Sequence, residues 1–215
     1  MVINDTQWKF SKHFMLEQPR KFFSIIKFFK GDLKMLMTYD QYLTCATEAY
    51  LRVQNAISKG RGNISFGEPG GFMENYKRDA CVKDLRAAAK KDLSSINSGM
   101  EACPTEENRI KVYAKFALDY KCGNCEEFSA LTFQILKTNG VRPLDWMKQE
   151  GYFGSDRGNH AFVIIGRDSA TTAEDISTWN SQVVWCDAYE RKIGGIKEIK
   201  ERFSGERISL RYRWP

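Results

Sequence analysis

The chain has 215 residues, a formal net charge of +6 and an ordinary globular composition, 42% hydrophobic and 28% charged. This length favours one domain with a substantial core. Lys and Arg are scattered rather than gathered into one run. We therefore expect solvated surface charge and no nucleic-acid partner.

No apolar run approaches the length that spans a bilayer, because the longest, from Phe22 to Phe29, is interrupted by Ser24 and Lys27. The first residues also lack the pattern of a Sec signal. A chain of this length does not need disulfides, so we expect free thiols and a cytoplasmic, reducing compartment. The six cysteines concerned are Cys45, Cys81, Cys103, Cys122, Cys125 and Cys186.

Residues 1–37 form an N-terminal segment rich in aromatic residues and lysines. A helix over residues 21–30 would gather its apolar side chains on one face. We favour docking of this face on the core, with weak contact to a membrane surface as the alternative. Residues 38–215 are expected to form a single domain with a helical N-terminal extension.

Three helices are predicted before the middle of the chain. Thr38 followed by Gln41 three residues later is a capping box that begins the first. A glycine-rich loop over 59–72 carries no phosphate-binding pattern, although long loops often border sites. The second helix is expected over 73–96 and the third from Thr105 to about residue 120.

The most informative stretch is a turn that leads directly into a further helix, at Cys125. Apolar residues at helical spacing follow it, and Gly140 supplies the stop. Cys125 is therefore placed at a helix N-terminus, where unpaired N–H groups and the helix dipole stabilise a thiolate. The predicted apolar stripe is Phe128, Leu131, Ile135 and Leu136.

After residue 140 the pattern changes from helices to strands. Residues 161–165 and 183–186 are short apolar runs typical of buried strands. Residues 208–213 alternate apolar with polar side chains, which predicts a strand with Arg211 and Arg213 on a solvent-facing side. Helices first and strands later indicate an α+β protein with a small antiparallel sheet.

Two buried strands place a base and an acid within reach of the thiol. His160 opens the first strand, Asp187 closes the second, and the connection 168–181 is long enough for a wide hairpin loop. His13, the only other histidine, has no catalytic-looking neighbour. Thiolate attack on an acyl carbon, with proton movement by imidazole and a carboxylate that orients the ring, is the chemistry of a Cys–His–acid relay.

These three stretches resemble the core motifs of the transglutaminase-like branch of papain-like cysteine enzymes, in particular its bacterial toxin and effector members. The stretches are Gly123-Asn124-Cys125-Glu126-Glu127-Phe128, Asn159-His160-Ala161-Phe162-Val163 and Val184-Trp185-Cys186-Asp187. The resemblance covers about residues 105–190.

The resemblance implies a papain/transglutaminase-like core with Cys125 as nucleophile, His160 as general base and then acid, and Asp187 as the orienting acid. The Cys125 backbone N–H would contribute to the oxyanion hole. Asn124, Asn159 and Tyr120 are further candidates for binding substrate or oxyanion, although Asn159 could equally make the turn. No cofactor and no metal are implied.

The activity implied is acyl transfer from a protein amide through a thioester. Deamidation of glutamine ranks first, with cross-linking and proteolysis as the other outcomes of the same intermediate. The partner would be a protein substrate, with a host protein as one option. An effector of this kind would enter the host cell without a Sec signal.

Two other classes of function stay open. Cys122 and Cys125 form a Cys-x-x-Cys pair at a helix start, so Cys122 is a possible redox partner in a thiol-disulfide oxidoreductase. A zinc site would need two further ligands at suitable spacing, which the sequence lacks. The third class is a non-catalytic binding module in which Cys125 only packs.

Overall fold

The structure is a computed structural model that describes residues 37–59, 71–96, 104–151 and 159–215. These residues belong to one unit, Met37–Pro215. The predicted segment 1–37 with its helix over 21–30, apart from Met37, lies outside the described residues. So does most of the glycine-rich loop over 59–72.

The described residues form five α-helices, one short 3-10 helix and five strands, and the helices before residue 140 lie near their predicted places. In chain order they are α2 (Tyr39–Ala56), α3 (Gly71–Ile96), α4 (Glu106–Tyr120), α5 (Cys125–Thr138), β1 (Leu144–Glu150), β2 (His160–Ile165), η3 (Ile176–Thr178), β3 (Val184–Asp187), β4 (Lys192–Gly194), α6 (Ile196–Arg202) and β5 (Arg207–Trp214). The capping box at Thr38 and the N-cap at Thr105 are both present, as the sequence predicted.

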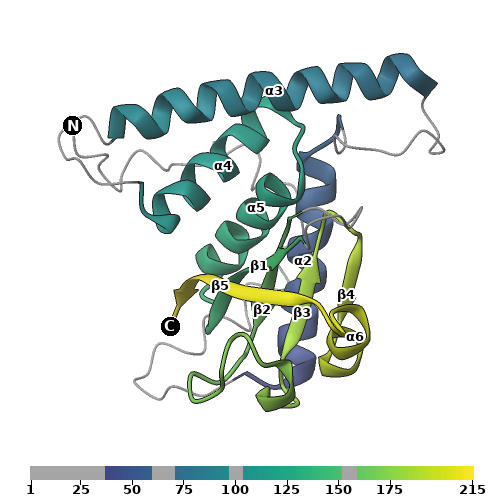
Figure 1. The fold of residues 1–215 in the computed structure, drawn as a ribbon, viewed down its shortest axis with the longest axis vertical. Coiled ribbons are helices and arrows are strands. Elements are labelled where there is room, and N and C mark those ends of the chain that lie inside the picture. The colour runs from purple at the N-terminus through teal and green to yellow at the C-terminus, as the bar shows by residue number, and fades with distance from the viewer. Residues whose placement is uncertain (1–36, 60–70, 97–103, 152–158) are drawn as a thin grey trace, which may run out of the picture. The chain divides into compact units, whose positions relative to one another are not determined.

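The five strands make one antiparallel sheet in the order β4-β3-β2-β1-β5. Helices α2 and α5 cover one face, and α6 packs near β3 and β4 on the other, while α3 packs on α4 (Figure 1). The predicted α+β class with an antiparallel sheet is confirmed. The pairing of β2 with β3 is also as expected, and it brings His160 and Asp187 to neighbouring strands.

Strand β1 was missed by the sequence analysis, and it lies between β2 and β5 near the middle of the sheet. Its Asp145 is only 1% exposed, because Arg167 and Arg213 both bind the carboxylate. A buried charge at the second position hid the apolar pattern of Leu144, Trp146 and Met147. The sheet therefore has a buried ion cluster at one end of β1.

The prediction of a solvent-facing side on β5 is wrong. The Arg211 side chain is only 13% exposed, and it lies over the Trp146 ring with 4.2 Å between guanidinium carbon and ring centroid. It also binds Glu126 and Glu106. Arg211 pairs with acids of α4 and α5, and Arg213 pairs with Asp145 of β1, so these polar residues bind acids rather than face water.

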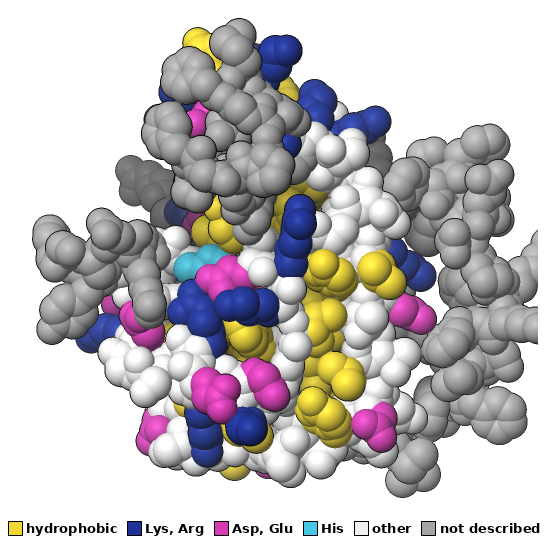
Figure 2. Space-filling view, turned by 90° about the vertical axis from the view of Figure 1, so that its right-hand side faces the viewer, with side chains coloured by type: hydrophobic (Ala, Val, Ile, Leu, Met, Phe, Trp, Pro, Cys, Tyr) yellow, Lys and Arg dark blue, Asp and Glu magenta, His cyan; other side chains and the backbone are white. Residues whose placement is uncertain are grey.

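The surface that can be viewed beside α2, β4 and α6 mixes acidic and basic side chains rather than presenting one basic patch (Figure 2). This agrees with the scattered charge of the sequence. In the described parts of the chain, no helix has the length and apolarity that crossing a bilayer requires.

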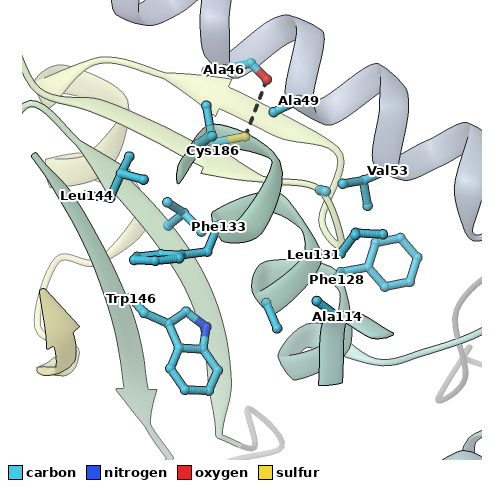
Figure 3. Close-up of a cluster of buried hydrophobic side chains, with 14 of the residues drawn as sticks. Ala46, Ala49, Val53, Ala114, Phe128, Leu131, Phe133, Leu144, Trp146 and Cys186 are labelled. Atoms are coloured by element: carbon cyan, nitrogen blue, oxygen red, sulfur yellow. Dashed lines mark hydrogen bonds between the residues drawn. The ribbon is translucent and has the colours of Figure 1, made fainter. Parts of the chain in front are cut away.

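Helix α5 lies at the centre of the larger core rather than on its surface. The predicted positions Phe128, Leu131 and Leu136 are buried, but so are Ala130 and Phe133 on other sides of the helix. Figure 3 shows side chains of α5 between those of α2, α4 and the sheet. A helix packed on several sides holds its N-terminus, and hence Cys125, in one place.

Candidate active site

The turn that carries Cys125 is built by a tight change of direction after α4. Lys121 ends α4 in the left-handed conformation, at φ 61°. A Cβ on Gly123 would come within 2.6 Å of the Glu127 Cβ, so only glycine fits here without displacing the helix. Asn124 is then the N-cap in extended conformation, and Cys125 is the first helical residue.

The N-terminus of α5 is closed by its own third residue. The Glu127 carboxylate accepts a hydrogen bond of 2.7 Å from the Asn124 backbone N–H, and the side chain of Glu127 is fully buried. The Asn124 side chain is 6% exposed, and its Oδ1 has no hydrogen-bond partner within the described chain. An unpaired buried acceptor beside the nucleophile is suited to a substrate N–H.

His160 and Asp187 meet because of the register between β2 and β3. Cys186 lies opposite Val163 in this antiparallel pair, so the next residue, Asp187, comes opposite Phe162. His160 is two residues before Phe162 and its side chain is therefore on the same face of the sheet. His160 Nε2 lies 2.5 Å from Asp187 Oδ2. The acid therefore holds one ring nitrogen, as an orienting residue does.

The Cys125 thiol is a second partner of the His160 ring. Burial opposes the charged ring, but hydrogen bonds to Asp187 and to the Cys125 side chain raise the pKa of His160 to about 10. The Cys125 Sγ also lies 3.7 Å from the Asn159 carbonyl oxygen, at the start of β2. The imidazole is therefore placed to exchange a proton with the thiol.

A second layer of contacts fixes Asp187. Its Oδ1 accepts a hydrogen bond of 2.9 Å from the Glu190 backbone N–H. Burial opposes the charge on Glu190, but the Arg202 guanidinium and the charge of His160 lower the pKa of this carboxyl to about 2. The Tyr189 ring packs against both His160 and Phe128, and so connects the sheet to α5.

The structure brings together three of the predicted site residues and separates others. Cys125, His160 and Asp187 form a continuous chain of contacts. The Asn159 side-chain oxygen accepts a hydrogen bond from the Gly151 N–H at 3.2 Å and is therefore already engaged within the chain. Tyr120 packs instead with the α3–α4 cluster around Cys122.

Cys122 is bonded to Cys81 of α3 in a disulfide across 41 residues, and not to Cys125. The expectation that all cysteines are free is therefore wrong for this pair, and Cys122 is not the redox partner of Cys125 here. Sequence spacing suggested the nearer partner, whereas packing of α3 on the buried turn selects Cys81. The free cysteines in the described segments are Cys45, Cys125 and Cys186.

One side chain near the relay had no signal in the sequence. Gln149 of β1 lies directly opposite His160 on β2, is 1% exposed, and neither end of its amide has a hydrogen-bond partner in the described segments. Opposed residues of an antiparallel pair point to the same face. Gln149 became visible as a neighbour of His160 only once β1 was placed.

The atoms of His160, Asp187 and Glu190 lie close enough to be compared with a metal site. The nitrogen and oxygen that would face the ion are instead hydrogen-bonded to each other, and Glu190 binds Arg202 through both oxygens. These donors are already in use. The group fits a proton relay better than a metal centre.

Taken together, the site offers a thiol at a helix N-terminus, an oriented imidazole and a buried acid on neighbouring strands. Figure 2 shows a histidine beside acidic and basic side chains on one face of the molecule. No family model, curated protein or solved structure matches the chain, so the assignment of function depends on this geometry.

Proposed function

We propose that the protein is a cysteine-dependent acyl-transfer enzyme that acts on protein amides, with deamidation of glutamine as its reaction. One observation carries the proposal: Cys125, His160 and Asp187, from three separate elements, meet in a hydrogen-bonded chain. The resemblance to papain/transglutaminase-like enzymes supports the same assignment of roles.

The reaction would proceed in two halves. The Cys125 thiolate attacks the carboxamide carbon, and the C–N bond breaks as His160 gives its proton to the leaving ammonia. Water then attacks the thioester, His160 takes the proton, and the C–S bond breaks to release a glutamate side chain. Asp187 holds the imidazole in the required tautomer throughout.

Charge on the carbonyl oxygen would be stabilised at the α5 N-terminus. The Cys125 backbone N–H is the first helical donor, and donors of this kind stabilise a developing oxyanion. Asn124 Oδ1 is the free acceptor next to it, and a substrate amide N–H would satisfy it. This leaves Asn124 as the second candidate substrate contact after the relay itself.

The proposed partner is a protein substrate, and the proposed setting is that of a bacterial effector or toxin that acts inside a host cell. A disulfide is typical of a protein that crosses an oxidising compartment, so the Cys81–Cys122 bond fits a secreted chain. The redox alternative loses its second thiol to that bond.

The test is a measurement of ammonia release and of substrate mass on glutamine-containing proteins, with and without an added amine. Deamidation adds about one dalton, cross-linking adds the amine less ammonia, and proteolysis splits the chain. Cys125→Ala and His160→Ala should each abolish turnover while leaving the circular-dichroism spectrum unchanged. Turnover by folded Cys125→Ala would overturn the proposal.

A further inference from the structure

Two glutamates follow the nucleophile directly, and their charges are unfavourable for it. Glu126 and Glu127 occupy the first turn of α5 next to Cys125. A carboxylate close to a thiol raises the thiol pKa, because like charges disfavour the thiolate.

Each glutamate is neutralised by an arginine from a different part of the chain. The Arg86 Nε of α3 donates to Glu127 Oε1 at 2.9 Å, and its Nη2 reaches Oε2 at 3.3 Å. Arg211 of β5 binds Glu126 at 2.9 Å. Arg86 also lies 3.8 Å from Glu126, so it faces both acids.

Of the two acids, Glu127 depends most on its partner. Its side chain is 0% exposed, so water cannot replace the guanidinium. A buried carboxylate without a partner carries a large desolvation penalty. The Glu127 carboxylate also accepts a hydrogen bond from the Asn124 N–H, directly before Cys125. One carboxylate therefore connects Arg86 to the turn that carries the nucleophile.

Helix α3 holds this turn at two points that flank Cys125. The Cys81–Cys122 disulfide attaches the residue three places before the nucleophile, and Arg86 holds the residue two places after it. Other charged and titratable groups near the turn are Glu106, Arg109 and Tyr113 of α4, Arg211 of β5, His160, Asp187 and Glu190. Among them, His160 is hydrogen-bonded to the Cys125 side chain.

We propose that Arg86 is a positioning residue for the nucleophile, which acts through Glu127 to hold the α5 N-terminus and to keep Cys125 reactive at neutral pH. This inference rests on the proposed function only in taking Cys125 as the nucleophile. It gives α3, which lies outside the region of family resemblance, a direct part in the site.

The experiment is the pH dependence of Cys125 alkylation by iodoacetamide, followed by peptide mapping so that the other cysteines are counted separately. Arg86→Gln should move the midpoint up by about one pH unit and slow labelling near neutral pH by about three- to tenfold. Arg86→Lys should shift less. Arg86→Gln combined with Glu127→Gln should return toward wild type, because the unpaired charge is removed with its partner.

Glu127→Gln alone keeps an acceptor for the Asn124 N–H and leaves Arg86 in place, so its midpoint should lie at or below that of wild type. Lys115→Met is the matched control, because it removes another contact between α4 and α3, the 3.5 Å pair with Asp92, away from the turn. Its profile should not move. Each variant is first shown to be folded by its unfolding midpoint.

Two results would overturn the inference: an unshifted midpoint in Arg86→Gln, or a double variant no closer to wild type than the single one. If Arg86→Gln does not fold, an upward shift in Glu127→Gln overturns it equally. Failure of the proposed function looks different. In that case His160→Gln leaves the wild-type labelling profile unchanged, whatever the Arg86 variants do.

Discussion

Two aspartates of one sheet are almost completely buried, yet they are held in opposite ways. Asp145 of β1 and Asp187 of β3 are each 1% exposed. Arg167 binds Asp145 at 2.6 Å and Arg213 binds it at 3.1 Å, and both cations keep their charge at any ordinary pH. Asp187 is paired with His160, whose charge depends on a proton, and with one backbone N–H.

The difference separates a structural ion cluster from a relay. Burial raises the pKa of the Asp145 carboxyl, although Arg167 and Arg213 oppose this shift from both sides. Neither arginine accepts a proton, so this cluster holds its part of the sheet together without forming a relay. The Asp187 end has one titratable partner, and that partner touches a thiol. Burial alone did not distinguish the two acids; the chemistry of their partners does.

The largest expected effect is on turnover at the Asp187 end. Asp187→Asn keeps the shape but cannot hold the imidazolium or select the ring tautomer, so activity should fall by about 10⁴-fold. The unfolding free energy should change far less. The readout is the rate constant of the amide reaction, with guanidinium unfolding as the control. A variant within tenfold of wild type would contradict the assignment of Asp187 as the orienting acid.

The Asp-to-Asn substitution at Asp145 should instead lower stability strongly and activity only slightly. Asp145→Asn leaves the buried guanidinium of Arg167 without its charged partner, so the unfolding free energy should drop by about 3–5 kcal/mol. Activity measured where the variant is still folded should stay within a few-fold of wild type. Loss of turnover in a stable Asp145→Asn protein would show that the two ends are not separate in function.

The smallest effect is a slope of stability with pH. His160 has a pKa raised to about 10 in the fold, against an unfolded value of 6.5, so its stabilising contribution is complete below pH 6.5. That contribution declines as pH rises from 6.5 toward 10, and the unfolding free energy should fall over this window. Asp145→Asn should keep the slope, because it leaves the His160–Asp187 pair in place, and Asp187→Asn should reduce it. Equal slopes in the two variants would count against the His160–Asp187 pair.

The relay was predictable because each of its residues lies at the end of an element with a strong local pattern. Cys125 begins a helix, His160 begins an apolar strand and Asp187 ends another. The pairing of the two strands then followed from their order along the chain. Local sequence patterns located the ends of these three elements, and the relay is formed by residues at those ends.

The supporting contacts were not predictable, because they join residues far apart in the chain. The carboxylates of Glu127 and Asp145 are bound by Arg86 and Arg213, 41 and 68 positions away. The choice of Cys81 for Cys122 likewise depends on the packing of α3. Six cysteines allow many pairings, and the sequence analysis expected free thiols and did not predict this one.

The place of β5 in the sheet has a consequence for the order in which the site is completed during synthesis. Chains emerge from the ribosome N-terminal end first, and Cys125 appears 86 positions before Arg211, which binds Glu126 in the first turn of α5. β5 also pairs with β1, so the strand next to β2 has no outer neighbour until the last strand arrives. A ribosome-bound chain that has already produced Cys125, His160 and Asp187 therefore still lacks an edge of the sheet and one of the two arginines of the nucleophile turn.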